Sequence, residues 1–328
     1  MNYRRFGHTE FEVSEVGFGA WGIGGAAMAG NIPIGWGATD DSVSKAAILK
    51  AYDLGINFFD TADFYGFGKS ESLIGETIAN KKDAIIATKA GHRLEADGSI
   101  VLDYSKNYIM QACEKSLKRL KRNEIDLYQL HSAKLVHLEQ GECIEAMERL
   151  KEQGKIRYWG ISLNTFNPQP EYNFLKKTGL CSSYQLVFNI LNQRALSLIQ
   201  EAENENNAVI ARMVLQFGLL SGNMSHERKF EENDHRSFRL SPDFIKSVNT
   251  AMKRVWDSAK KKGMNPTELA VSFCLWQRGI ATVIPGIKTP AQAQTNASSV
   301  KEYDQYLDNL LKNLYDEELH KFTEKMEK

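Results

Sequence analysis

A chain of 328 residues with 42% hydrophobic and 25% charged residues has the composition of a globular protein, which excludes global disorder. Basic and acidic residues number 41 each, so no positive excess attracts nucleic acid. The most apolar stretch, residues 16–38, is uncharged but holds eight glycines and Pro33, which disfavours a membrane helix. The N-terminus lacks the apolar core of a signal peptide. We therefore expect a cytoplasmic protein with no nucleic-acid or membrane partner.

Metal chemistry is also disfavoured. The four cysteines are scattered without a C-x-x-C pair, and the seven histidines include no H-x-x-x-H spacing. We expect reduced, structural thiols and no metal site.

Short β-rich runs alternate with longer helical patterns along most of the chain, which is typical of βα units around a parallel sheet. Residues 2–13 predict a hairpin that closes the N-terminal end of a barrel, and residues 303–325 predict an amphipathic helix outside it. The predicted strands are 16–19, 57–60, 84–88, 126–130, 157–162, 183–186, 209–212 and 282–285, and helical patterns include 44–54, 108–121, 143–152 and 194–204. Eight such units in about 250 residues predict an α/β fold, the (β/α)8 TIM barrel, as a single domain over residues 1–328.

Polar residues end three neighbouring predicted strands, at the edge where such barrels carry their active sites. The second strand ends at Asp60 and runs into a turn with Tyr65, the third ends at Lys89, and the fourth at His131. A cation lowers the pKa of a nearby tyrosine, which is otherwise about 10, and a carboxylate balances that cation. A neutral imidazole can hydrogen-bond a substrate oxygen. Each residue alone has a structural explanation, but together they suit protonation of a carbonyl oxygen as hydride reaches the carbon.

The motifs around these residues resemble those of the aldo-keto reductases over almost the whole chain. They are DTADFYGFGKSE at 60–71, ATK ending at Lys89, LH ending at His131, GIS at 160–162, YQ at 184–185, GLLSG at 218–222 and VIPG at 283–286. The resemblance implies NADPH-dependent reduction of aldehydes or ketones, with Tyr65 as general acid, Lys89 and Asp60 tuning it, and His131 orienting the carbonyl.

The resemblance also implies residues for cofactor and substrate. The expected cofactor contacts are Gly19, Ala20, Trp21, Asp60, Ser162, Gln185, Arg212, Leu215, Gly218, Leu220, Gly286, Lys288, Gln292 and Asn296. The expected substrate contacts are Trp21, Phe64, Tyr65 and His131, and the loop from Gly22 to Thr39 would be a flap over the site that is mobile when empty. Trp36 and Phe188 are further candidates for a partly aromatic pocket, which would suit sugars, aromatic aldehydes and keto compounds alike.

The chain departs from the family pattern in four places, one of which involves two residues. Leu163 stands where a carboxamide-contacting Asn is common, and Arg212 stands where an aromatic ring often stacks on the nicotinamide. Gly286 and Gln292 replace the cations that grip the 2′-phosphate in many members, and Thr295 replaces an acidic residue before Asn296. With Lys288 as the only nearby cation in that loop, we expect a weak preference for NADPH, with NADH possible.

Two alternatives stay open. Gly17, Gly19 and Gly22 fit G-x-G-x-x-G, but the helix that a Rossmann fingerprint must open into is delayed by further glycines and Asp60 is too far away. A regulatory protein that senses redox state through the same barrel and cofactor, as potassium-channel beta subunits do, would keep the same four residues, whereas a silent barrel scaffold would not need them. The sequence leaves monomer and homo-oligomer equally open.

Overall fold

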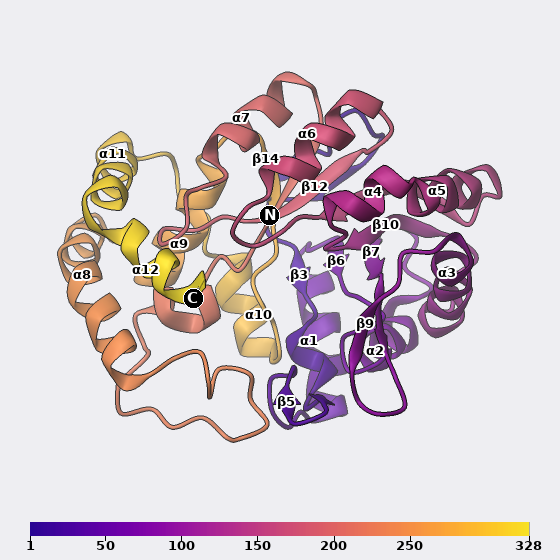
Figure 1. Cartoon of the computed structure of the whole chain (residues 1–328). Helices are drawn as coiled ribbons and strands as arrows, with labels where there is room; N and C mark the ends of the chain where they lie inside the picture. The colour runs from indigo at the N-terminus through magenta and orange to yellow at the C-terminus, as the bar shows by residue number, and fades with distance from the viewer. Residues whose placement is uncertain (328) are drawn as a thin grey trace.

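Eight parallel strands form the centre of the molecule in the computed structural model, which describes residues 1–327 (Figure 1). Their order in the sheet is β14-β13-β12-β11-β10-β7-β6-β3, and the bridges Val16–Val283 and Gly19–Gly286 join the two edges into a closed barrel. The strands are β3 (Phe18–Gly19), β6 (Phe58–Asp60), β7 (Ile85–Ala90), β10 (Ile125–His131), β11 (Ile156–Ser162), β12 (Ser183–Val187), β13 (Ala208–Arg212) and β14 (Ile280–Val283). The predicted (β/α)8 barrel is confirmed.

Helices surround these strands (Figure 1). They are α1 (Asp41–Asp53), α2 (Lys69–Ile78), α3 (Lys106–Leu120), α4 (Leu135–Gln140), α5 (Glu142–Glu152), α6 (Gln169–Thr178), α7 (Leu196–Asn204), α8 (Pro242–Lys261), α9 (Pro266–Leu275) and α10 (Pro290–Ala297). Side chains at several N-termini satisfy otherwise unpaired backbone N–H groups, as Asp40 does for α1 and Ser105 for α3. The four helical patterns predicted from the sequence lie within one or two residues of α1, α3, α5 and α7, apart from the first residues of α1.

Side chains alternate along the strands, so that the barrel interior is apolar toward the N-terminal ends of the strands and polar at their C-terminal ends. Successive side chains of a strand point to opposite faces, so Ile85, Ala87 and Lys89 of β7 share the interior face. The same period places Phe58 below Asp60 in β6. It places Leu127 below Gln129 and His131 in β10. Each of these strands therefore contributes side chains both to the apolar core and to the polar end of the barrel.

The N-terminal hairpin fills the apolar end, as predicted. Strands β1 (Tyr3–Arg5) and β2 (Glu12–Ser14) are antiparallel, and the turn between them inserts Phe6 and Phe11 beneath the barrel. Phe6 is fully buried and its ring centroid lies 5.7 Å from that of Phe58. The hairpin thus continues the barrel core at one end.

Two further small hairpins rise from loops at the opposite end. Strands β4 (Met28–Ala29) and β5 (Ile32–Pro33) lie in the glycine-rich loop after β3, and strands β8 (His92–Leu94) and β9 (Ile100–Leu102) follow β7. The backbones of Gly30 and Gly98, in the two turns, approach so closely that a Cβ on Gly98 would lie 2.9 Å from the Gly30 nitrogen. The loop predicted as a flap therefore has secondary structure of its own.

The C-terminal segment folds as helix α11 (Gln305–Leu314), a π-helical turn η3 (Tyr315–Leu319) and helix α12 (His320–Glu327). Phe322 of α12 packs against Phe244 of α8, and the Thr323 hydroxyl donates to the carbonyl of Leu191. The predicted outer helix is confirmed, but the π turn divides it and lets α12 pack against the strand-end loops. Among residues 1–327, no helix has the length and apolarity required to cross a membrane.

Candidate active site

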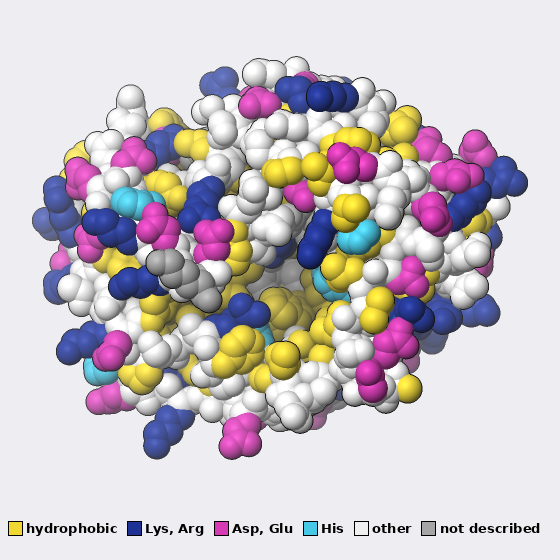
Figure 2. Space-filling model, in the orientation of Figure 1, with side chains coloured by type: hydrophobic (Ala, Val, Ile, Leu, Met, Phe, Trp, Pro, Cys, Tyr) yellow, Lys and Arg dark blue, Asp and Glu magenta, His cyan; other side chains and the backbone are white. Residues whose placement is uncertain are grey.

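A cavity of about 840 Å³ opens among the C-terminal ends of the strands. Figure 2 shows it as the hollow near the centre of the face, with hydrophobic side chains along its rim and basic side chains beside it. Asp60, Tyr65 and His131 are among the residues that line it. The sequence-predicted site and the large cavity therefore coincide.

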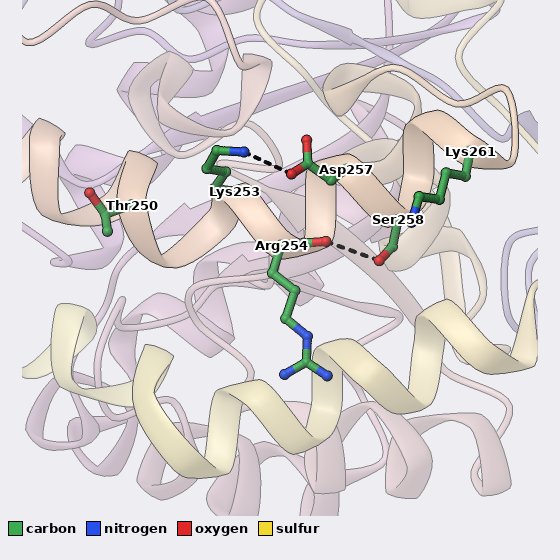
Figure 3. Close-up of a pocket in the computed structure, with 6 residues that line it drawn as sticks. All are labelled: Thr250, Lys253, Arg254, Asp257, Ser258 and Lys261. Atoms are coloured by element: carbon green, nitrogen blue, oxygen red, sulfur yellow. Dashed lines mark hydrogen bonds and ion pairs between the residues drawn. The ribbon is translucent and has the colours of Figure 1, made fainter.

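A second hollow lies on the outer face of α8 and has a different character (Figure 3). Its lining comes from this one helix, and the Lys253 ammonium contacts the Asp257 carboxylate at 2.9 Å across one turn. One helix surface provides no opposing wall, and none of the predicted site residues lies there. The predicted site residues therefore belong to the barrel cavity and not to this hollow.

Lys89 connects the predicted catalytic residues. Its side chain is fully buried, and Nζ donates to Asp60 Oδ2 at 2.6 Å and to the carbonyl of Thr61 at 2.8 Å. Nζ also lies 3.4 Å from the hydroxyl oxygen of Tyr65. The Tyr65 ring in turn meets the ring of His131 edge-on, with centroids 5.8 Å apart. The four residues predicted from separate strand ends thus form one cluster.

The Asp60 carboxylate is fixed on its other side by two amides. Oδ1 accepts hydrogen bonds from Gln185 Nε2 at 2.7 Å and from Gln129 Nε2 at 3.3 Å. A buried carboxylate with two amide donors and an ammonium partner is well satisfied, so Asp60 holds Lys89 in place. Gln129 was not among the residues predicted for the site, and Gln185 was predicted only as a cofactor contact. Gln129 could have been found from the sequence, because it lies two residues before His131 and therefore on the same face of β10.

Burial and charge set the protonation states of the cluster. Burial raises the pKa of Tyr65, and the nearby Lys89 cation offsets part of this rise. The expected lowering by Lys89 is thus present but outweighed, and Tyr65 keeps its proton at neutral pH. Burial would lower the pKa of Lys89, but the Asp60 carboxylate raises it above the usual value, so Lys89 is charged. Burial holds the pKa of His131 well below its usual range, so His131 is a neutral imidazole.

The turn after β6 positions Tyr65. The Thr61 and Asp63 N–H groups donate to the carbonyls of Ala87 and Lys89, which extends the β6–β7 pairing beyond the strand. Gly66 has φ +60°, and a Cβ there would lie 2.2 Å from the carbonyl oxygen of Gly24. Only glycine accepts both this conformation and this contact. The glycine-rich loop therefore sits directly on the turn that carries Tyr65.

Most of the predicted cofactor residues line the same cavity. The exceptions are Leu220 and Asn296, whose side chains are buried, and Asn296 donates to the carbonyl of Gly286 at 3.4 Å. The cavity runs from Ser162 and Gln185 beside the cluster to Lys288 and Gln292 at its far end. A Cβ on Gly286 would meet nothing within 4 Å, so the wall is open there. The lining is long and polar enough to fit a dinucleotide. The family resemblance implies the nicotinamide beside Ser162 and Gln185 and the adenosine beside Gln292, so we call the Gln292 end of the cavity the adenosine end.

The adenosine end is richer in cations than the sequence analysis expected. The loop between η2 (Gln216–Ser221) and α8 adds Arg228, Arg236 and Arg239 to the cavity wall that Lys288 shares. Arg236 pairs with Asp234 at 2.6 Å, whereas no ion pair to a carboxylate is formed by Arg228, Arg239 or Lys288 within residues 1–327. Lys288 Nζ donates instead to the carbonyl of Trp36 at 3.0 Å. Lys288 is therefore not the only cation available to a phosphate.

His235 joins this loop to the glycine-rich flap. The backbone N–H of His235 donates to the carbonyl of Gly35 at 3.0 Å, and Trp36 pairs with Asp234 in an antiparallel bridge. The His235 ring stacks on Trp21 with centroids 4.6 Å apart, and burial lowers its pKa to about 4, so it is neutral. Two loops about 200 residues apart in the sequence thus form one wall of the cavity.

The expected substrate side is largely apolar. Phe64, Ile32 and Ile34 line it beside the cluster, and the His92 ring stacks on His131 at 4.3 Å. Trp21 and Trp36 also line the cavity, as expected. Phe188 does not: it is fully buried and stacks on Phe273 of α9, at 5.6 Å. The suggestion that Phe188 belongs to the pocket is wrong, because its position follows the outward-facing residues of β12.

Comparison with known proteins agrees with this geometry. Residues 15–314 match the model of the Aldo/keto reductase family. The chain is 33% identical over 299 residues to the uncharacterized oxidoreductase YqkF of Bacillus subtilis, covering 90% of each chain, and 30% identical to the aldo-keto reductase YhdN of the same organism, covering 95% of each. The structure is similar to that of the glycerol dehydrogenase AKR11B4 from Gluconobacter oxydans, with a TM-score of 0.80, 27% identity and coverage of 96% and 95%. The chain therefore belongs to the aldo/keto reductase family of NAD(P)H-dependent oxidoreductases, which act on carbonyl compounds.

Proposed function

We propose that this protein reduces aldehydes or ketones to alcohols with NADPH, and that Tyr65 supplies the proton. The observation that carries the proposal is the contact of one buried ammonium, Lys89 Nζ, with both the Asp60 carboxylate and the Tyr65 hydroxyl. A tyrosine that keeps its proton and lies beside a fixed cation is suited to general-acid catalysis.

The residues divide the reaction between them. The bound cofactor supplies hydride to the carbonyl carbon. Neutral His131 donates a hydrogen bond to the carbonyl oxygen and orients it toward Tyr65. The Tyr65 hydroxyl gives its proton to that oxygen as negative charge develops, and Lys89 stabilises the resulting phenolate until solvent returns the proton. Asp60, held by Gln129 and Gln185, keeps Lys89 at the distance this requires.

The preference for NADPH over NADH rests on the cations at the far end of the cavity. A 2′-phosphate carries close to two negative charges and is best recognised by arginine. Arg228 and Arg239 lie in the cavity wall together with Lys288. Their side chains fit a phosphate there, whereas the corresponding hydroxyl of NADH offers them no charge to bind.

The test is turnover by the purified protein with NADPH and a panel of aldehydes and ketones, followed by loss of reduced-cofactor absorbance. We expect reduction by the wild type and almost none by Tyr65→Phe, which keeps the ring and removes only the acid. NADPH titration of both proteins should give equal dissociation constants, which shows that the variant is folded and loaded. A protein that binds NADPH but reduces no member of the panel would favour the redox-sensing role instead.

A further inference from the structure

Arg212 is a cation in the cavity wall whose hydrogen-bond acceptors are all neutral. Its Nη2 donates to the carbonyl of Leu163 at 3.2 Å and to the hydroxyl of Thr165 at 3.1 Å, and its Nη1 lies 3.5 Å from Met213 Sδ. Its Nε is buried without a partner. No carboxylate within residues 1–327 pairs with this guanidinium in an ion pair of 4.0 Å or less, so its charge is not neutralised locally. Burial lowers the pKa of Arg212, but a guanidinium stays protonated at neutral pH.

The surrounding groups do not cancel this charge. Asp60 is the carboxylate of the cluster, and it already contacts Lys89 at 2.6 Å. His131 and His92 are neutral, since burial holds the pKa of both below the usual value, for His92 at about 4. The charges of Lys89 and Asp60 neutralise each other, so Arg212 gives this part of the cavity wall one net positive charge.

Arg212 ends β13, next in the barrel to β12, which carries Gln185. Its hydrogen bonds tie it to the loop that follows Ser162 at the end of β11. It therefore lies at the end of the cavity where Ser162 and Gln185 would hold the nicotinamide, and not among the cations of the adenosine end. This step rests on the proposed function, which places the cofactor in this cavity.

We infer that Arg212 makes the site discriminate between the two oxidation states of the cofactor, binding NADPH more tightly than NADP+. The two differ at the ring: the dihydronicotinamide is neutral, and the nicotinamide of NADP+ carries a positive charge. A positively charged ring held in the same partly dry part of the cavity as this guanidinium would be repelled by it, whereas a neutral ring would not. The phosphates and the adenosine are the same in both forms, so this repulsion is not offset elsewhere.

The same charge has a second effect on the reaction. The positive charge of Arg212 stabilises the substrate oxygen as it becomes negative. It destabilises the positively charged ring that would remain after hydride has left. The repulsion makes bound NADP+ a stronger hydride acceptor, so its benefit lies in ready release of NADP+ and not in a lower barrier to hydride transfer. For alcohol oxidation, the same repulsion weakens the capture of NADP+ from solution.

Direct binding measurements test this without turnover. Titration calorimetry of the full chain with NADPH and with NADP+ should give dissociation constants that differ at least about tenfold, which is about 1.4 kcal/mol. Arg212→Gln keeps hydrogen-bond donors without the charge and should bring the two constants within about threefold. Arg212→Lys retains the charge and should keep most of the difference.

Arg239→Gln is the matched control, because it removes a cation from the adenosine end. It should weaken NADPH and NADP+ alike and leave their ratio unchanged. Equal dissociation constants in the wild type would overturn the inference and leave the proposed function intact, and so would an unchanged ratio in a folded Arg212→Gln. Failure of the wild type to bind either form would overturn the proposed function and this inference together.

Discussion

The two ends of the barrel interior are built from the same eight strands but differ in the polarity of the side chains that they bury. The N-terminal end is an apolar core of Phe6, Phe58, Ile85 and Leu127, closed by the hairpin. The C-terminal end buries an ammonium and a carboxylate in contact with each other, two positions further along the strands. Burial of apolar groups stabilises a fold, whereas burial of an ion pair contributes little net stability and is weak evidence for a structural role. The comparison predicts that substitutions at one end change stability and those at the other change activity.

Tyr65→Phe should give the largest effect and should act on activity alone. The change removes one hydroxyl group and its contact with Lys89 Nζ. Removal of a general acid lowers rates by 10²–10⁴-fold, and we expect kcat/KM for aldehyde reduction to fall by about 10³-fold. The denaturation midpoint should stay within about 1 kcal/mol of the wild type. A large loss of stability in this variant would break the division between the two ends.

Phe6→Ala should have the opposite profile. Phe6 is fully buried against Phe58 and Phe11, so truncation leaves a cavity in the apolar core. We expect a loss of about 3–4 kcal/mol in the free energy of unfolding, measured with urea, while the folded protein keeps its kcat. Arg5→Ala, on the exposed face of the same hairpin, is the control and should change stability by less than about 0.5 kcal/mol. Loss of kcat in folded Phe6→Ala would show that the hairpin reaches the chemistry.

Lys89→Met should affect both properties and so sharpen the comparison. Without the cation the pKa of Tyr65 rises further, because Lys89 is the group that most lowers it. A weaker acid donates its proton more slowly, and we expect about a 10²-fold fall in kcat. The alkaline limb of the pH profile, where Tyr65 loses its proton, should move to higher pH.

The same change leaves the Asp60 carboxylate buried without its cation, which should also cost stability. Lys89→Arg is the comparison that retains charge. An unaltered pH profile in folded Lys89→Met would remove the electrostatic role of Lys89.

Arg239→Gln and Lys288→Ala should give the smallest effects, on cofactor choice alone. Each removes one exposed or half-buried cation from the adenosine end of the cavity. We expect the dissociation constant for NADPH to rise about fivefold in each variant, with a flatter salt dependence, while that for NADH stays constant. If the wild type prefers NADH, the placement of the 2′-phosphate at this end is wrong.

The fold and the central cluster could be predicted because their signals are local. Each of Asp60, Lys89 and His131 ends a short apolar run, and the topology of the barrel alone brings strand ends together. Gln129 follows from the same period of two, once His131 is assigned to the interior. Phe188 was placed wrongly because its ring follows the face of β12 that packs against helices.

The adenosine end could not be predicted in the same way. Arg228, Arg236 and Arg239 belong to a long loop without hydrophobic periodicity. Its path depends on the pairing of Trp36 with Asp234, which no local pattern encodes. The sequence therefore pointed to Lys288 alone, the cation that follows the last strand directly.

The pairing of Trp36 with Asp234, together with the contact of His235 with Gly35, joins the loop after β3 to the loop before α8 in one wall of the cavity. Phe64 and Ile32, on the expected substrate side of the cavity, take no part in this pairing. A dinucleotide bound as proposed would lie under the paired loops, and we expect its exchange to require that the two loops separate. We therefore expect the nucleotide to bind before the carbonyl substrate and to leave after the alcohol, because only its exchange requires the loops to open.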